Sequence, residues 1–298
     1  MDESVPRMLS ISIPAMHAST APDYLEASRT GDRRRPPGVP ECLPFRRSGS
    51  GDGEMVREAI LAIADRFPRY GSRRVKAALR RRGLVVNHKK VRRIMREEGL
   101  CVVWKRPMPP PGASGCPLPD FPNRLLGLDV TGPDQAWAVD ITMIKLEFEC
   151  VFLAAILDIF TRRCVGWSLG REINDRLLVR ALRTALRARA GKELTGLIHH
   201  SDQGFVYAVR GYTGILGRKG ILVSQSRRGK PYDNAFVESF FATLKCEEVY
   251  LHGYSTYEQA LEGLWAFIED VYNTKRLHSA LGYRPPAEFE EALATCAP

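Results

Sequence analysis

Residues 136–142 read AWAVDIT, an apolar run with a single carboxylate, Asp140, at its centre. Large apolar side chains occupy every second position from Trp137 to Met143, and this period of two predicts a β-strand. An isolated Asp is usually a solvated surface charge, but one flanked by strand residues on both sides is a candidate for a site. Asp140 therefore directs attention to other acids that sit in apolar surroundings.

Two further carboxylates share this kind of surrounding. Asp202 ends the run LTGLIHHSDQG (194–204), and Glu238 lies within the helix-like run DNAFVESFFATLK (233–245). Asp202 and Glu238 have 35 residues between them, so only a fold can gather the three acids. Three converging carboxylates suit two Mg²⁺ (or Mn²⁺) ions, which can activate a nucleophile and stabilise a leaving oxygen in phosphodiester cleavage. Without metal the three charges would repel and some would be protonated.

The Glu238 helix supports this reading geometrically. At 100° per residue, and with Phe236 set at 0°, Asn234, Lys245 and Glu238 fall at about 160°, 180° and 200°, on one shoulder of an apolar arc. Glu238 can then face metal ions while Lys245 and Asn234 approach DNA. A Glu/Lys pair at the edge of an amphipathic helix is also common without any such role.

Charge is concentrated in one part of the chain. The net charge is +10 over 298 residues, and residues 65–106 contain 15 Lys/Arg against 3 Asp/Glu, a net +12, so the rest carries −2. Such a stretch indicates a polyanionic partner, although a basic, well-solvated helix surface is the plainer alternative.

The basic stretch lies within three short helix-like runs between residues 54 and 104. Asn87 can cap the third run, whose apolar positions Val91, Ile94 and Met95 face inward. Its outward positions are all basic: Lys89, Lys90, Arg92, Arg93 and Arg96. We expect a helix-turn-helix domain that inserts this helix into DNA. A small basic bundle that touches only phosphates remains the alternative.

Composition divides the remainder of the chain. Residues 1–50 mix Pro, Ser, Gly and Arg without a period and are expected to be disordered. Seven prolines between 105 and 122 predict an extended linker over 105–134. The second domain, 135–290, reads as three strands in hairpin succession, then alternating helices and strands, then two long helices at about 234–250 and 256–272. This order predicts an α/β, RNase H-like mixed sheet.

Several classes of protein are disfavoured. No apolar run reaches the roughly 18 residues that a membrane span needs. The acidic N-terminus MDESVPRMLS lacks the features of a signal peptide, and the seven cysteines contain no CxxC pair, so a disulfide framework is not expected. We expect a cytoplasmic protein.

Four stretches together resemble a known family: WAVDIT, LIHHSDQG, YDNAFVESFFATLK and YNTKRLHSALGYRPPAEF. They are similar to the signature blocks of the integrase-core (DDE) transposases encoded by the second reading frame of bacterial insertion sequences, which are related to retroviral integrases. PRYGSRRVKAALRRRG and VRRIMREEGL resemble that group's helix-turn-helix segment. The resemblance covers roughly residues 55–290.

The resemblance implies the activity and its site. Asp140, Asp202 and Glu238 would be the catalytic metal ligands, with Lys245 near the end DNA. The reaction would be strand cleavage and strand transfer at transposon ends, commonly through a circular intermediate. The partners would be end and target DNA, further copies of the chain on that DNA, and an upstream-frame helix-turn-helix protein or fusion; association with the bacterial nucleoid follows.

The sequence also departs from this pattern. Val206 stands where the family usually has a polar Gln before the Tyr. A catalytically inactive remnant, or a regulator that only binds DNA, is therefore the alternative to an active transposase; a plain RNase H-like nuclease fits the basic domain and Lys245 less well.

Other polar residues are assigned structural roles. His199 and His200 are neighbours on a strand and point to opposite faces, so orienting or packing roles are favoured over a shared metal. Asp158 is expected to pair with Arg162 or Arg163. For four residues at the end of the last long helix, a role in tying that helix to the core is at least as well supported as a functional one: Tyr272, Asn273, Arg276 and His278.

Overall fold

The computed structural model describes residues 52–100, 121–202, 210–227 and 234–295. The N-terminal stretch 1–50, most of the proline-rich run and Val206 lie outside these residues, so the expectations about them stay predictions.

Three helices form the N-terminal described part: α1 (Asp52–Arg66), α2 (Ser72–Arg81) and α3 (His88–Glu97). Val56, Ile60 and Ile63 recur at helical spacing in α1 and are buried against apolar residues of α2 and α3. Gly83 follows α2 at φ +82°, a left-handed conformation that suits glycine and ends the helix. Asn87 caps α3, since its side chain accepts the Lys89 amide.

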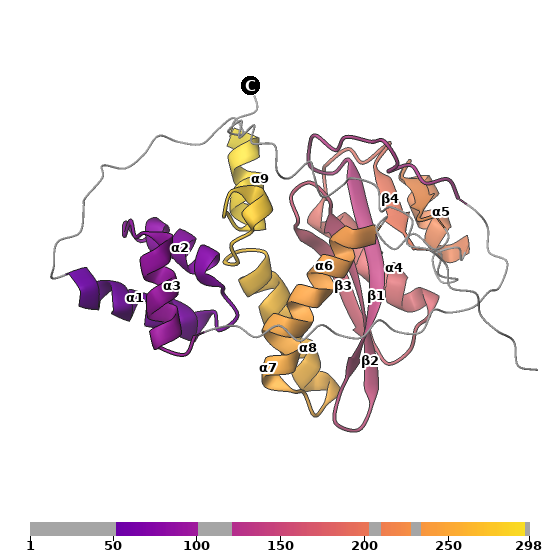
Figure 1. Ribbon diagram of the computed structural model, residues 1–298. Helices are drawn as coiled ribbons and strands as arrows, with labels where there is room; N and C mark the ends of the chain where they lie inside the picture. The colour runs from indigo at the N-terminus through magenta and orange to yellow at the C-terminus, as the bar shows by residue number, and fades with distance from the viewer. Residues whose placement is uncertain (1–51, 101–120, 203–209, 228–233, 296–298) are drawn as a thin grey trace, which may run out of the picture. The chain divides into compact units, whose positions relative to one another are not determined.

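A five-stranded mixed sheet forms the second part of the fold (Figure 1). Its strands are β1 (Ala136–Lys145), β2 (Cys150–Asp158), β3 (Cys164–Gly170), β4 (Ile198–Ser201) and β5 (Leu222–Gln225). Their order is β3-β2-β1-β4-β5: the first three are antiparallel neighbours, and β4 and β5 run parallel to β1. The predicted α/β, RNase H-like class is confirmed.

Strand β4 begins at Ile198 and ends at Ser201, the residue before Asp202. Gly196 has φ +84° and donates its amide to the Gly220 carbonyl, so the chain turns there before it extends.

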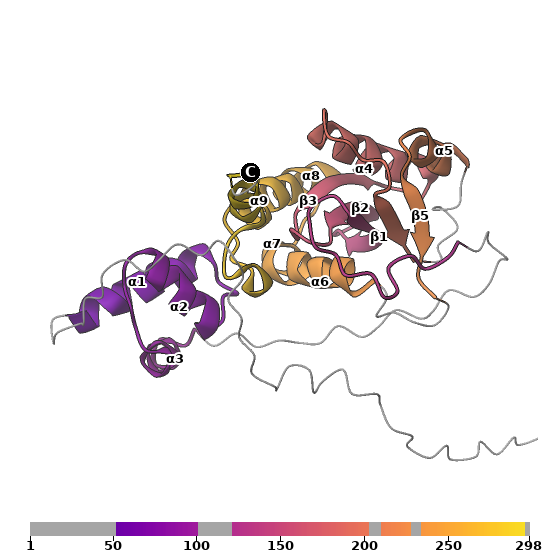
Figure 2. The ribbon, with the colours of Figure 1, turned by 90° about the horizontal axis from the view of Figure 1, so that it is seen from above.

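Helices cover both faces of the sheet (Figure 2). One face packs against α4 (Asp175–Ala188) and α5 (Arg210–Arg218), and Trp137, Val139 and Ile156 supply the strand side chains of that core. Gly166 permits the close approach of α4, since a Cβ at this position would lie 2.4 Å from the Ala181 carbonyl oxygen.

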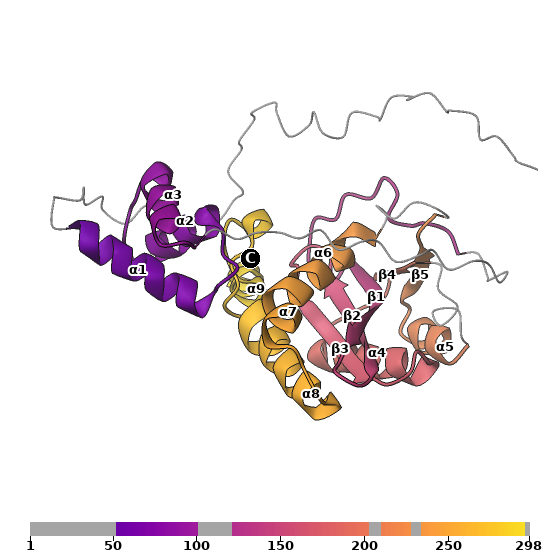
Figure 3. The same ribbon diagram turned by 60° about the horizontal axis from the view of Figure 1, so that its bottom comes forward.

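The opposite face packs against the C-terminal helices, which Figure 3 brings forward. These are α6 (Ala235–Leu244), η3 (Lys245–Val249), α7 (Tyr250–His252), α8 (Tyr257–Trp265) and η4 (Ala266–Tyr272), followed by η5 (Ser279–Leu281) and α9 (Pro286–Thr295). The two long helices expected at about 234–250 and 256–272 are confirmed. Each changes from α to π geometry part-way, in η3 and η4, which the sequence did not predict.

The stretch before β1 lies along the sheet edge. The Phe121 amide donates to the Gln225 side chain, and the Arg124 amide donates to Ser224 Oγ over 2.9 Å. Residues 121–124 are thereby fixed beside β5, while the boundary between linker and core stays a prediction. In the described ranges, no helix has the length and apolarity to cross a membrane.

Candidate functional site

The parallel pairing of β1 and β4 places Asp140 and Asp202 side by side. The last pair in the register of these two strands is Val139 with Ser201. Asp140 is the next residue of β1, which continues to Lys145, and Asp202 directly follows the end of β4. Asp140 is half-buried and Asp202 is exposed.

The N-terminus of α6 lies against β1 beside Asp140. The Asn234 side chain donates from Nδ2 to the Val139 carbonyl oxygen over 3.3 Å, immediately before Asp140 in β1. Glu238 follows one turn later and is exposed. Partial burial, and then the negative charge of Asp202, raise the pKa of Glu238 above its ordinary value. Glu238 therefore lies within electrostatic range of Asp202.

Lys245 begins the π-helical segment η3, two turns after Glu238. Burial lowers its pKa, and the carboxylate of Asp140 opposes that change. The ammonium group thus belongs to the same electrostatic environment as the acids. Asp202 acts electrostatically on Glu238, and Asp140 acts on Lys245, so each aspartate is within electrostatic range of one charged residue of the α6–η3 helix.

Across residues 52–100, 121–202, 210–227 and 234–295, no group of three or more His, Cys, Asp or Glu side chains is close enough to hold an ion. The donor set nevertheless suits a hard cation, since it consists of carboxylate oxygens. Burial, followed by the charge of Asp202, raises the pKa of Glu238, and a bound cation would favour its charged form. The role of the triad as metal ligands stays a prediction.

Asn234 differs from the other predicted DNA contacts because it is buried, with 4% of its surface exposed. Its side-chain nitrogen donates to β1, and its buried Oδ1 has no hydrogen-bond partner among the residues that the structure describes. Its contact with DNA stays a prediction, whereas its contact with β1 is an observed feature of the fold.

The two strand histidines have separate partners. His199 Nε2 bonds to Tyr212 Oη over 3.0 Å, while His200 bonds to Ser224 and Ser226 through its two ring nitrogens. Burial lowers the pKa of His199 to about 3, so its ring is neutral. The predicted packing and orienting roles agree with these contacts.

The expected pairing of Asp158 with Arg162 or Arg163 is wrong. Asp158 is fully buried, and its oxygens accept the backbone amides of Asp134, Phe160 and Thr161. Arg163 instead forms an ion pair with Glu290, 2.6 Å away. The turn that follows β2 supplies N–H donors directly to the carboxylate, so no side-chain cation is needed.

The basic face of α3 is formed as expected. Lys89, Arg92, Arg93 and Arg96 are exposed, and Lys90 is half-buried. Glu97 lies 3.6 Å from Arg93, so part of that arginine's charge is balanced on its own helix. The structure thus presents a basic helix face, and its contact with DNA stays a prediction.

A buried ion cluster beside η3 was missed by sequence reasoning. Arg276 donates two hydrogen bonds of 2.7 Å to Glu247, and Arg74 of α2 lies 3.5 Å from the same carboxylate. Leu277 donates its amide to Tyr70 Oη over 2.9 Å. Residues 70–74 thus contact the segment after η4. Arg74 is 173 residues from Glu247, and Tyr70 is 207 residues from Leu277, so no local pattern could have indicated these two contacts.

The comparisons with known proteins define the class. An HTH-like domain family matches residues 52–107, and two integrase core domain families match residues 130–231 and 219–286. The protein thus joins an HTH-like domain to an integrase core. Among solved structures, the HTLV-2 integrase catalytic core domain in complex with magnesium aligns at 15% identity with a TM-score of 0.40, covering 53% of this chain and 97% of that chain.

Curated relatives define the family more closely. The transposase for insertion sequence element IS904 of Lactococcus lactis is 35% identical over 244 residues, which cover 80% of this chain and 94% of the relative. The transposase InsF for insertion sequence IS3A of Escherichia coli is 35% identical over 224 residues, covering 74% and 77%. The chain belongs to the integrase-core transposases of insertion sequences.

Proposed function

We propose that this chain cleaves DNA at the ends of an insertion sequence and transfers the freed 3′ end to target DNA, with Asp140, Asp202 and Glu238 as the ligands of two Mg²⁺ or Mn²⁺ ions. The observation that supports this most directly is the parallel register of β1 and β4, in which Asp140 and Asp202 immediately follow the pair Val139 and Ser201. The effect of Asp202 on the pKa of Glu238 brings in the third acid.

Each residue has a role that follows from its position. The two aspartates would supply oxygens from neighbouring positions beside β1 and β4, and Glu238 would supply a third from α6, whose start Asn234 joins to β1. When bound, two divalent cations would activate the attacking oxygen and stabilise the leaving one. Carboxylates that repel in the free protein would close around such charges. The proximity of Lys245 to Asp140 suits a phosphate contact next to the scissile bond.

The N-terminal domain would supply affinity for DNA. The exposed cations of α3, together with a net charge of +12 over residues 65–106, favour contact with the phosphate backbone. We propose that further copies of the chain assemble on the two transposon ends, and that an upstream-frame protein or fusion assists end recognition.

Purified protein with Mg²⁺ or Mn²⁺ should nick duplexes that carry the inverted repeats flanking its gene. Asp202→Asn should lower the rate of nicking by at least about 10³-fold and leave DNA affinity unchanged, since the lost carboxylate serves the chemical step. Asp175→Asn is the matched control, because Asp175 is an exposed acid in the first turn of α4. Nicking that survives Asp202→Asn would refute the triad. A wild-type chain that binds the ends but does not cut them would indicate the inactive alternative.

A further inference from the structure

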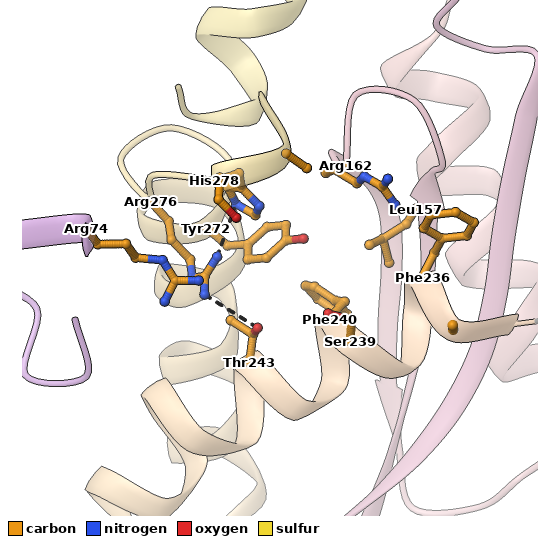
Figure 4. A pocket seen from close by; sticks show the side chains of 13 residues that line it. Arg74, Leu157, Arg162, Phe236, Ser239, Phe240, Thr243, Tyr272, Arg276 and His278 are labelled. Carbon is orange, nitrogen blue, oxygen red and sulfur yellow. Dashed lines mark hydrogen bonds between the residues drawn. The ribbon is translucent and has the colours of Figure 1, made fainter. Parts of the chain in front are cut away.

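A cavity of about 360 Å³ borders α6 (Figure 4). On α6 it is lined by Ser239 and Thr243, which on a 100° helical wheel stand about 100° and 140° away from Glu238. Its other walls come from Arg162, after β2, and from Arg276 and His278 after η4. The cavity is therefore separate from the acids, although the same helix borders both.

The arginines that line this cavity carry more positive charge than their carboxylate partners neutralise. Among the described residues, Glu247 is the one carboxylate with which both Arg276 and Arg74 form ion pairs. Arg162 makes no ion pair in the described part of the chain, and its guanidinium lies over the Phe236 ring, 4.2 Å from the centroid. Burial lowers the pKa of Arg162, and Asp158, which acts on it electrostatically, already accepts three backbone amides.

Three arginines, Arg74, Arg162 and Arg276, line the cavity together with His278. Burial, followed by the charges of Arg276, Arg74 and Arg162, lowers the pKa of His278 to about 2. The ring is therefore neutral and adds no positive charge. An anion in the cavity would relieve the repulsion among the three guanidinium groups.

Neutral donors complete the lining. The hydroxyls of Ser239, Thr243 and Ser279 border the cavity, and Arg276 Nη2 lies 3.5 Å from Thr243 Oγ1. Guanidinium and hydroxyl donors arranged around one space are suited to an anion with several oxygens. Ser239 and Ser279 are exposed, so the cavity is accessible from solvent.

We propose that this cavity binds a phosphate group, with Arg162 as its principal ligand and Arg276, Ser239 and Thr243 around it. A space of about 360 Å³ accommodates a phosphate with an attached sugar. The phosphate comes either from the DNA backbone or from a free phosphate compound. The DNA source rests on the proposed function, since α6 would then contact the substrate on both its acidic and its basic side; binding of free phosphate does not.

The test uses the full chain without divalent metal, titrated with inorganic phosphate at constant ionic strength and followed by calorimetry. Arg162→Gln should weaken phosphate binding by about tenfold or more, because a charge-assisted contact is lost. Arg183→Gln is the matched control: it removes an exposed arginine from α4, on the other face of the sheet, and should bind as the wild type does. Equal binding by the two variants overturns the proposal.

Ser239→Asp keeps the test decisive if Arg162→Gln folds poorly. It places a negative charge at an exposed position of the lining and should repel phosphate, whereas Ser239→Asn should not. Phosphate binding that is unchanged in Ser239→Asp also overturns the proposal.

DNA titrations distinguish a phosphate of the DNA backbone from a free phosphate compound as the ligand of the cavity. If a backbone phosphate occupies the cavity, inorganic phosphate competes with DNA, and Arg162→Gln lowers the salt slope of DNA binding by about 0.9 relative to Arg183→Gln. If the ligand is a free phosphate compound, Arg162→Gln loses phosphate binding and keeps the DNA slope. Because neither measurement needs cleavage, failure here is distinguishable from failure of the proposed metal chemistry.

Discussion

The side-chain nitrogen Nδ2 of Asn234 donates a hydrogen bond to the Val139 carbonyl oxygen over 3.3 Å. It thereby joins the start of α6 to β1 at the residue before Asp140. This bond connects the element that carries the third acid to the strand that carries the first. The distance between Glu238 and the aspartates therefore depends on a residue that is itself buried and bears no charge.

Asn234→Ala should lower the rate of strand cleavage and weaken Mn²⁺ binding, because α6 loses its attachment to β1. The free energy of unfolding should fall by about 1–3 kcal/mol, since the Val139 carbonyl loses a buried donor. Calorimetric Mn²⁺ titration and single-turnover cleavage measure the two effects. Asn234→Asp, similar in shape but without the donor, should behave likewise. A variant with weaker DNA binding but normal Mn²⁺ affinity would instead identify Asn234 as a DNA contact.

Glu238→Gln should stabilise the metal-free protein at neutral pH. The pKa of Glu238 is raised in the folded state, first by burial and then by Asp202, so folding favours the protonated form. Its contribution to stability is therefore present below the unfolded pKa and is lost as pH rises through the folded pKa. Because the side chain is largely exposed, the gain should stay below about 1 kcal/mol.

Denaturant melts of both proteins measure this effect. The difference between Glu238→Gln and wild type should be seen at pH 7 and disappear once the pH falls below both pKa values. At pH 7, saturating Mn²⁺ should make the wild type more stable than Glu238→Gln, because the wild type alone retains the full set of carboxylates. A variant less stable than wild type in the absence of metal would show that the acids do not repel one another.

Sequence periodicity anticipated the elements but not all of their contacts. The alternation around Asp140 gave β1, and the spacing of Val91, Ile94 and Met95 gave α3. The adjacency of Asp140 and Asp202 required the pairing of β1 with β4, which joins residues about 60 apart and leaves no local signal. A helical wheel describes one helix alone.

The helical wheel placed Asn234 and Glu238 on the same side of the helix. It could not show that β1 lies close enough to bury Asn234. The predicted partner of Asp158 was wrong for a related reason. Charge matching proposed an arginine partner, whereas the turn after β2 directs backbone amides at the carboxylate. Backbone donors carry no residue-type signature, so composition cannot predict them.

Asn273→Ala should destabilise the fold without changing DNA affinity. The Asn273 side chain accepts the Cys164 amide and donates to the Cys164 carbonyl, both over 3.0 Å, and so fixes the start of β3 to the end of η4. Alanine leaves both backbone groups unpaired in a buried position, which costs about 1–3 kcal/mol for each. Thermal unfolding gives the loss. Thr274→Ala is the control, since Thr274 is exposed. An Asn273→Ala protein with normal stability and weaker DNA binding would favour a functional role.

Replacing Arg92 and Arg93 with Gln should weaken DNA binding and flatten its dependence on salt by up to about 1.8 in the slope of log K against log salt, because each lost phosphate contact contributes about 0.9. Arg92 should account for the larger share, since Glu97 partly balances Arg93. Arg176→Gln with Arg183→Gln removes two exposed charges from α4 and should leave the slope unchanged.

A comparison of DNA binding to matching ends and to a scrambled duplex separates the two interpretations of this domain. A helix that reads bases in the major groove should lose preference for the matching ends when Lys89 or Arg92 is replaced, whereas a bundle that touches only phosphates should lose affinity equally for both. A slope that does not respond to Arg92 and Arg93 would place the DNA surface elsewhere on the chain.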